Sequence, residues 1–214
     1  MKKSYFILII LLLTVFLIFN STILLAQDDQ EEDTVYINAD HLKYEDEKTI
    51  LTGNITIRKQ NTIINAQKGE LFREENRLLL EEQINVDYDD GKVNSNKLTA
   101  LLKADEYIFE NQVSLDYIMD NEENMTLNSE YLKIFGDNNS FTAKNNVFII
   151  YEGKNFKGDN AEYNGEEEIL YLTGNVLIEE GEDWVKSNEA RFFLGEGEEG
   201  YTADGDVEIK ITLD

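Results

Sequence analysis

The tetrapeptide Leu51-Thr52-Gly53-Asn54 returns much later in the chain as Leu172-Thr173-Gly174-Asn175. Each copy precedes a short run of mostly apolar residues that suits a β-strand, 55–57 after the first copy and 176–178 after the second. Gly and Asn are the residues that best tolerate a positive φ, so each copy predicts a sharp corner in a strand. Two identical corners suggest a repeat that fills the sequence between them.

Alignment on the Asn of the two copies gives four further corners with the same pattern. The polar residue at the aligned position is Asn54, Gln83, Gln112, Asn146, Asn175 or Asp206. A β-branched residue follows it directly in every copy, and another apolar residue stands two positions later. The residue just before it is Gly53, Glu82, Asn111, Asn145, Gly174 or Gly205. The pattern predicts a corner or bulge followed by a strand with one apolar face.

The earlier half of each copy carries a second set of columns. A polar residue recurs at Asp40, Gln67, Asn96, Glu130, Asp159 and Asn188. The residue before it is always small: Ala39, Ala66, Ser95, Ser129, Gly158 or Ser187. Small side chains at one level of every copy predict a close approach between two layers.

These columns predict an all-β fold made of about six stacked repeats of about 29 residues, with the domain spanning 35–211. Each unit is expected to hold two or three short strands, and stacked neighbours complete one continuous apolar interior. The chain has no Pro, which agrees with long uninterrupted strands.

Composition excludes several classes of function. The chain has no Cys and a single His (His41), so neither a thiolate nor a His-rich metal site is available. The net charge of −25 disfavours nucleic-acid binding, which needs a basic surface. Acidic runs such as 166–168 and 179–183 lack the spacing of a calcium loop, and we interpret them as solvated turns. We predict no catalytic residue, no metal site and no cofactor.

The first residues are typical of an export signal. Lys2 and Lys3 precede an apolar run from Tyr5 to Phe19, and Ala26 offers a cleavage point. We therefore predict a signal peptide over 1–26 and an acidic linker over 27–34. The apolar stretch is also long enough to cross a bilayer, so a retained inner-membrane anchor is the alternative.

At this point the chain resembles the OstA-like family, also called the LptA family. Ile37 to Tyr44 followed by Leu51 to Ile55 carries the resemblance, as does Gly158 to Tyr163 followed by Leu172 to Val176. The family includes the periplasmic lipopolysaccharide-transport protein LptA, its inner-membrane partner LptC and the N-terminal part of the outer-membrane receptor LptD. The resemblance implies an open, twisted antiparallel β-jelly roll with an apolar interior.

The resemblance also implies a function and a site. The protein would hold the acyl chains of lipid A, the anchor of lipopolysaccharide, in the periplasm and bridge LptC-like and LptD-like partners between the two membranes. The implied groove lining is the column after each corner: Ile55, Ile57, Ile84, Val86, Val113, Leu115, Val147, Ile149, Val176 and Ile178. Strand addition at the two ends, to a partner or to another copy, is the expected mode of assembly.

Three alternatives remain open on sequence grounds. The protein could be an anchored LptC-like component. It could be a structural β-solenoid at the cell surface that binds no lipid. A polysaccharide-cleaving enzyme on a β-helix is the third, and it is disfavoured because the carboxylates cluster in turns and no nucleophile motif is present.

Overall fold

The computed structural model describes residues 34–88, 90–119, 123–136, 138–195 and 200–213. The predicted export signal and all but the last residue of the acidic linker lie outside these ranges. Residues 35–214 form one compact unit, separate from the first 34 residues. Within the described ranges, no helix is long and apolar enough to span a membrane.

The described residues form a single antiparallel sheet of fourteen strands, which confirms the all-β prediction. The strands are β1 (Val35–Asn38), β2 (His41–Glu45), β3 (Lys48–Lys59), β4 (Thr62–Phe72), β5 (Arg77–Tyr88), β6 (Gly91–Leu101), β7 (Glu106–Ile118), β8 (Asn124–Phe135), β9 (Ser140–Tyr151), β10 (Lys154–Asn164), β11 (Ile169–Glu180), β12 (Asp183–Phe193), β13 (Gly200–Asp204) and β14 (Glu208–Lys210).

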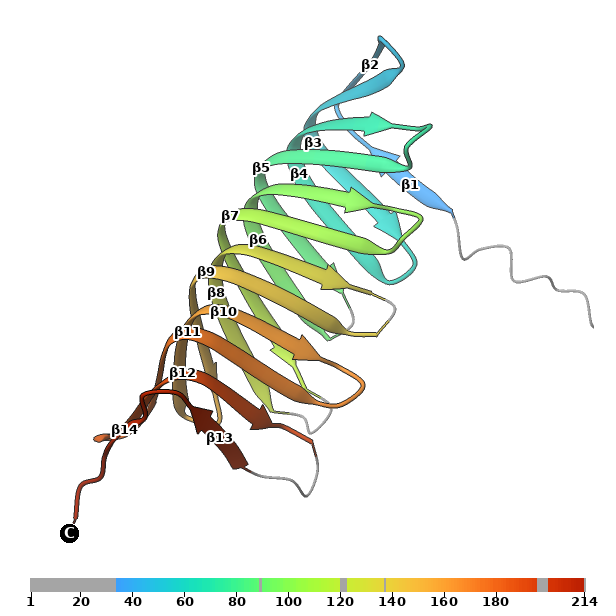
Figure 1. Ribbon diagram of the computed structural model, residues 1–214. Helices are drawn as coiled ribbons and strands as arrows, with labels where there is room; N and C mark the ends of the chain where they lie inside the picture. The colour runs from blue at the N-terminus through green and yellow to red at the C-terminus, as the bar shows by residue number, and fades with distance from the viewer. Residues whose placement is uncertain (1–33, 89, 120–122, 137, 196–199, 214) are drawn as a thin grey trace, which may run out of the picture. The chain divides into compact units, whose positions relative to one another are not determined.

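The sheet follows the order of the chain. From β3 to β12 each strand pairs with the strands before and after it in sequence (Figure 1). At one end β1 and β2 both pair with β3, and at the other end β13 and β14 both pair with β12. Each end of the sheet is therefore a pair of short strands separated by a corner.

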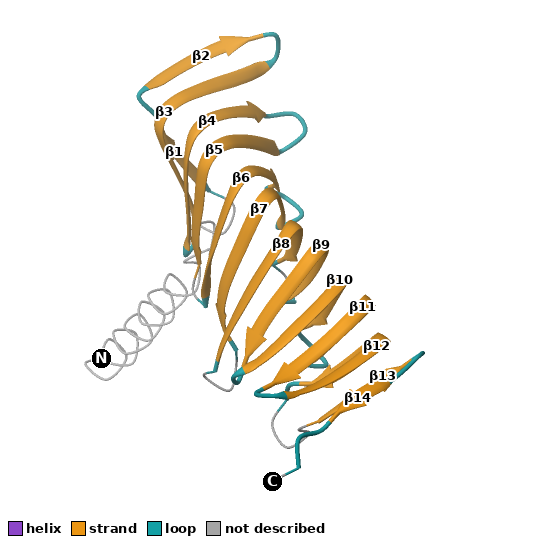
Figure 2. Ribbon diagram, turned by 90° about the vertical axis from the view of Figure 1, so that its left-hand side faces the viewer, coloured by secondary structure: helices purple, strands orange, loops and turns teal. Residues whose placement is uncertain are grey.

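Each long strand bends near its middle, and the bends fold the sheet into two walls (Figure 2). The pairing register shifts at each bend, for example between Thr52 and Ile55 in β3 and between Glu81 and Ile84 in β5. In the odd-numbered strands from β3 to β11, the half that follows the corner belongs to what we call the first wall. The halves of the even-numbered strands that pair with these halves belong to the first wall too. The remaining halves form the second wall. Phe156 of the first wall packs edge-on against Phe192 of the second, with ring centroids 4.5 Å apart. The inner faces of the two walls thus meet in one apolar core.

The corners have the positive φ that the sequence predicts. Gly53, Glu82, Asn111, Asn145, Gly174 and Gly205 have φ values between 64° and 76°. The polar residue that follows is left-handed too, from 42° at Asn54 to 58° at Gln112. Because two consecutive residues turn this way, the strand changes direction by a bulge while its next apolar side chain still points inward.

Hydrogen bonds between the two polar columns hold several corners. The Asn54 amide donates to Asp40 Oδ2 at 2.8 Å, and the Asn175 amide donates to Asp159 Oδ2 at 2.8 Å. The backbone N–H of Asp40 also donates to the Gly53 carbonyl at 2.9 Å. The two polar columns identified in the sequence therefore meet along the outside of the bend.

The small column lies inside the bend. Ala66 pairs with Ile55, Ser95 with Ile84 and Ser129 with Val113, so each small residue faces the β-branched residue that follows a corner. The buried hydroxyls of Ser95, Ser129 and Ser187 bond the carbonyl two residues ahead. A larger side chain here would meet the inner faces where they converge, which explains the column.

One expectation about the elements needs correcting. Most strands contain 11 to 13 residues and run continuously through the corner, so a repeat is two long bent strands and not two or three short ones. The double left-handed corner bends a strand without ending its pairing. The number of repeats stays a prediction.

Candidate functional site

The ten residues predicted to line a groove share one position in the structure. All ten lie on the inner face of the first wall, are at most 4 % exposed, and belong to one apolar cluster. Their neighbours Thr56 and Leu177 face the opposite side of the sheet and are partly exposed. These ten side chains therefore face the interior and are packed against the second wall, and their contact with a lipid stays a prediction.

The second wall supplies the other side of the interior and was not included in the predicted lining. Its buried residues include Leu51, Leu80, Phe109, Ala143 and Leu172, which are the apolar column three positions before each corner polar residue. The shared parity of these residues with those after the corner was the signal that could have placed them in the same interior.

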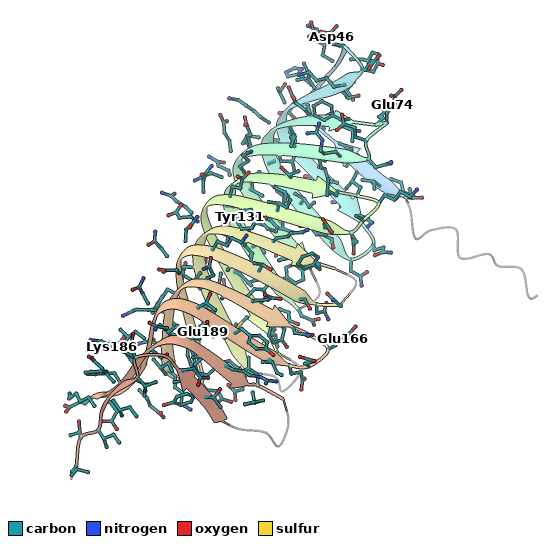
Figure 3. All side chains as sticks on the ribbon, viewed as in Figure 1. Asp46, Glu74, Tyr131, Glu166, Lys186 and Glu189 are labelled. Carbon is teal, nitrogen blue, oxygen red and sulfur yellow. The ribbon has the colours of Figure 1, made fainter. Side chains whose placement is uncertain are left out.

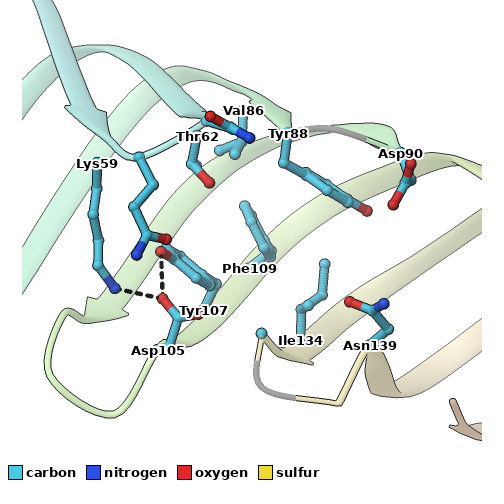
Figure 4. A pocket seen from close by; sticks show the side chains of 13 residues that line it. Lys59, Thr62, Val86, Tyr88, Asp90, Asp105, Tyr107, Phe109, Ile134 and Asn139 are labelled. Atoms are coloured by element: carbon cyan, nitrogen blue, oxygen red, sulfur yellow. Dashed lines mark hydrogen bonds and ion pairs between the residues drawn. The ribbon is translucent and has the colours of Figure 1, made fainter. Parts of the chain in front are cut away.

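The walls separate on the side opposite the bend, and this open side is called the seam below. A cavity of about 220 Å³ lies there between the hairpin turns of the two walls (Figure 4). Val86, Phe109 and Ile134 give it an apolar floor, and polar residues from the turns surround its mouth. Its full lining is Lys59, Gln60, Asn61, Thr62, Val86, Tyr88, Asp90, Asp105, Tyr107, Phe109, Ile134, Gly136 and Asn139.

An ion pair crosses the seam at this cavity. Lys59 Nζ at the end of β3 lies 2.6 Å from Asp105 Oδ1 in the turn before β7, and it also donates to the Leu102 carbonyl at 3.1 Å. The Tyr107 hydroxyl donates to the same Asp105 oxygen at 3.0 Å. Burial raises the pKa of Tyr107 and of Tyr88, with the nearby acidic groups adding to the effect, so both phenols stay protonated. Sequence reasoning missed this cluster because its members come from turns far apart in the chain.

The outer surface is acidic and solvated. Asp46, Glu74 and Glu166 project from turns between strands, as Figure 3 shows. Lysines on the strands pair with acidic residues on neighbouring strands, as Lys97 does with Glu110. No group of three or more potential metal ligands occurs in the described part of the chain.

Exposed apolar side chains gather at the two ends of the sheet. Tyr36, Leu42 and Tyr44 lie on β1 and β2 and are more than 60 % exposed. At the other end the exposed apolar residues are Tyr201, Val207, Ile209, Ile211 and Leu213. In the ranges that the structure covers, Ile118 and Ile150 are the remaining large apolar residues of this kind. The ends of the sheet, and not its flanks, therefore carry most of the exposed apolar surface.

The fold therefore has an interior lined by apolar side chains, and its edge strands have backbone groups that can pair with another strand. The packed interior and part of the lining of the seam cavity present apolar side chains.

Comparisons with known proteins identify a structural neighbour and a family. A crystal structure of LptH from Pseudomonas aeruginosa, the LptA-homologous periplasmic component of a lipopolysaccharide transport device, matches with 11 % sequence identity and a TM-score of 0.33. That match covers 86 % of this chain and 98 % of the other. No protein of curated function matches the chain in sequence. The model of one family, described as LptA/(LptD N-terminal domain) LPS transport protein, matches residues 36–198. The chain, which also has the all-β architecture expected from its sequence, therefore belongs to the LptA/LptD N-terminal domain family of lipopolysaccharide (LPS) transport proteins.

Proposed function

We propose that this protein carries the acyl chains of lipopolysaccharide between its two walls, in the periplasm. The observation that supports the proposal most is the continuous apolar interior, which extends from Leu51 in β3 to Phe192 in β12. Membership of a lipopolysaccharide transport family agrees with such a ligand. The interior is then both the core of the protein and the surface that an acyl chain contacts.

A hinge at the bend lets one set of residues serve both purposes. Backbone pairing runs along each wall and through the corners, whereas the two inner faces contact each other through side chains. Separation of the walls would break apolar contacts but no sheet hydrogen bonds. Each methylene of a ligand that replaces those contacts contributes about 0.8 kcal/mol. An acyl chain can therefore offset the cost of opening the interior.

The two ends of the sheet suit a bridge between membranes. The outer edges of β1 and β2, and of β13 and β14, have no strand partner among the described residues. Such edges pair readily with another chain, and the exposed apolar residues beside them would be buried on pairing. The partners we propose are an LptC-like inner-membrane protein, an LptD-like outer-membrane protein, or a second copy of this chain.

The test compares neighbouring residues that face opposite sides of β11. Ile178→Asp places a charge on the inner face, where the parent side chain is 4 % exposed, while Leu177→Asp places it on the outer face. We expect the first to weaken binding of a fluorescent fatty acid by about tenfold or more, because a buried charge is costly. The second should change the affinity by less than about twofold.

Circular dichroism of both variants separates loss of binding from loss of fold. If Ile178→Asp unfolds, the uncharged Ile178→Asn takes its place in the same comparison. Equal loss of binding from both faces, in folded protein, contradicts the proposal. Absence of binding by the parent protein contradicts it as well.

A further inference from the structure

The cavity at the seam is distinct from the predicted groove. Of the ten groove residues only Val86 lines it, and its other apolar residues, Phe109 and Ile134, come from the second wall. A narrower cavity of about 20 Å³ shares Tyr88, Ile134 and Asn139 as lining and reaches one more groove residue, Leu115. The two cavities thus form a wide pocket that continues into a narrow one along the seam, which suits a linear ligand better than a compact one.

The ion pair at this cavity differs from the others. Of the nine ion pairs among the described residues, eight join residues on one hairpin or on neighbouring paired strands. Lys59 and Asp105 instead join the end of β3 to the turn before β7, which lie on different walls. The Lys59 side chain is only 11 % exposed, whereas that of Asp105 is 37 % exposed, so the pair is partly shielded from solvent. We refer to Lys59, Asp105 and Tyr107 as the seam latch.

We propose that the seam cavity binds the end of a single acyl chain of an amphiphile, and that the seam latch must open to admit it. The inference deepens the proposed function, on which it rests, by giving the chain a specific point of insertion. The size fits one chain end: the cavity of about 220 Å³ exceeds the apolar cavity of about 150 Å³ that is known to hold benzene. It is too small for several whole acyl chains.

The position of the latch explains why it controls insertion. Lys59 on the rim of the first wall meets Asp105 on the rim of the second at one end of the cavity, and Val86, Phe109 and Ile134 lie further along it (Figure 4). An alkyl chain that enters at this end of the cavity must pass between these two side chains and break their contact. The latch therefore opposes separation of the walls where the interior is already partly hollow.

A reversible cross-link tests the latch. Because the chain has no Cys, Lys59→Cys combined with Asp105→Cys gives two unique thiols on opposite rims. A short bis-methanethiosulfonate reagent joins them, and dithiothreitol releases them. Stopped-flow fluorescence with cis-parinaric acid, a linear fluorescent fatty acid, measures insertion. We expect the bridged protein to bind about tenfold more slowly or worse, with recovery after reduction.

The matched control bridges a pair within one wall. Lys97 Nζ lies 2.6 Å from Glu110 Oε2 on neighbouring strands, so Lys97→Cys with Glu110→Cys accepts the same reagent without crossing the seam. Binding should be unaffected by that bridge. The single variant Lys59→Met should bind about threefold to tenfold faster than the parent, in proportion to the loss of a partly buried ion pair.

Filling the cavity tests the site itself. Ile134→Trp occupies the floor, whereas Ile108→Trp adds the same bulk on the outer face of the adjacent strand β7. We expect the first to weaken cis-parinaric acid binding by about tenfold and the second to leave it unchanged. If the parent binds and the seam bridge and Ile134→Trp both leave rate and affinity unaltered, the seam inference is wrong while the proposed function stands. Failure of the parent to bind overturns both.

Discussion

At each corner of the sheet the backbone adopts the left-handed region twice in succession, a conformation that costs most residues about 1–2 kcal/mol. Gly53 and Gly174 avoid that cost, and the Asp side chain of the preceding polar column lies close to each Gly. A Cβ built on Gly53 would lie 2.6 Å from Asp40 Oδ2. The Gly is therefore required for space as well as for φ.

A pair of Gly→Ala substitutions separates these two requirements. Gly53 and Gly153 have nearly equal φ values of 75° and 74°, but a Cβ on Gly153 has no neighbour within 4 Å. We expect Gly153→Ala to lower the free energy of unfolding by about 1 kcal/mol and Gly53→Ala to lower it by about 2 kcal/mol or more. Urea denaturation measures both. Equal losses would mean that Asp40 moves aside without cost.

Some corner residues can be predicted from the sequence more readily than others. Gly53, Asn111 and Gly174 are recognisable because few residue types tolerate positive φ. Glu82 has a φ of 66° and carries no such signal, and its place came only from alignment with the other copies. Its carboxylate pairs with Lys68 across the bend, a contact that depends on the folded register.

At the scale of strands, the backbone N–H groups of β13 point alternately toward β12 and toward the open edge of the sheet. The Asn188 N–H donates to the Gly205 carbonyl at 2.9 Å, and hydrogen-bonded pairs alternate along an antiparallel ladder. Ala203 therefore points its N–H toward β12, whereas Thr202 points its N–H to the open edge. A neighbour that pairs with β13 would receive the Thr202 hydrogen bond.

Proline at these two positions tests strand addition. Thr202→Pro removes a donor from the open edge, so we expect the monomer to stay folded but to lose end-to-end assembly or partner capture. Ala203→Pro removes a donor that β12 uses and should lower the stability of the terminal strands. Light scattering and circular dichroism distinguish the outcomes. Assembly by Thr202→Pro at the parent's level would argue against pairing through β13.

Element order follows from the sequence better than element length. The alternation around each corner predicted strands on both sides, and the recurring columns predicted that neighbouring strands stack in chain order. Periodicity alone could not show that Lys48 to Lys59 is one bent strand, because a bulge and a strand end use the same residues. The seam latch was beyond reach, since Lys59 and Asp105 meet only when both walls are in place.

At the scale of the whole molecule, the most prominent electrostatic feature is the large excess of negative over positive charge. The chain has 44 acidic and 19 basic residues, and the compact state brings the excess negative charges together. The Debye length falls from about 30 Å at 0.01 M salt to about 10 Å at 0.1 M. Screening over this range should weaken the repulsion between the walls and between neighbouring turns.

We therefore expect NaCl to raise the thermal midpoint by about 4 °C or more over that range, given about 2–4 °C per kcal/mol for a domain of this size. MgCl₂ at equal ionic strength should act equally if screening alone is responsible, because the Debye length depends on ionic strength. Differential scanning fluorimetry provides the comparison. A clear excess effect of Mg²⁺ would show that some acidic turns bind cations specifically.

The chain-order pairing of the strands has a consequence for how the protein is made. From β3 to β12 each strand needs only its sequence neighbours to complete its ladders. A segment that is synthesised first can therefore fold before the rest of the chain follows, and each later hairpin adds to an existing edge. The same property means that the length of the sheet can change in steps of one repeat. Removal or duplication of one pair of bent strands would shorten or lengthen the sheet while leaving its cross-section unchanged.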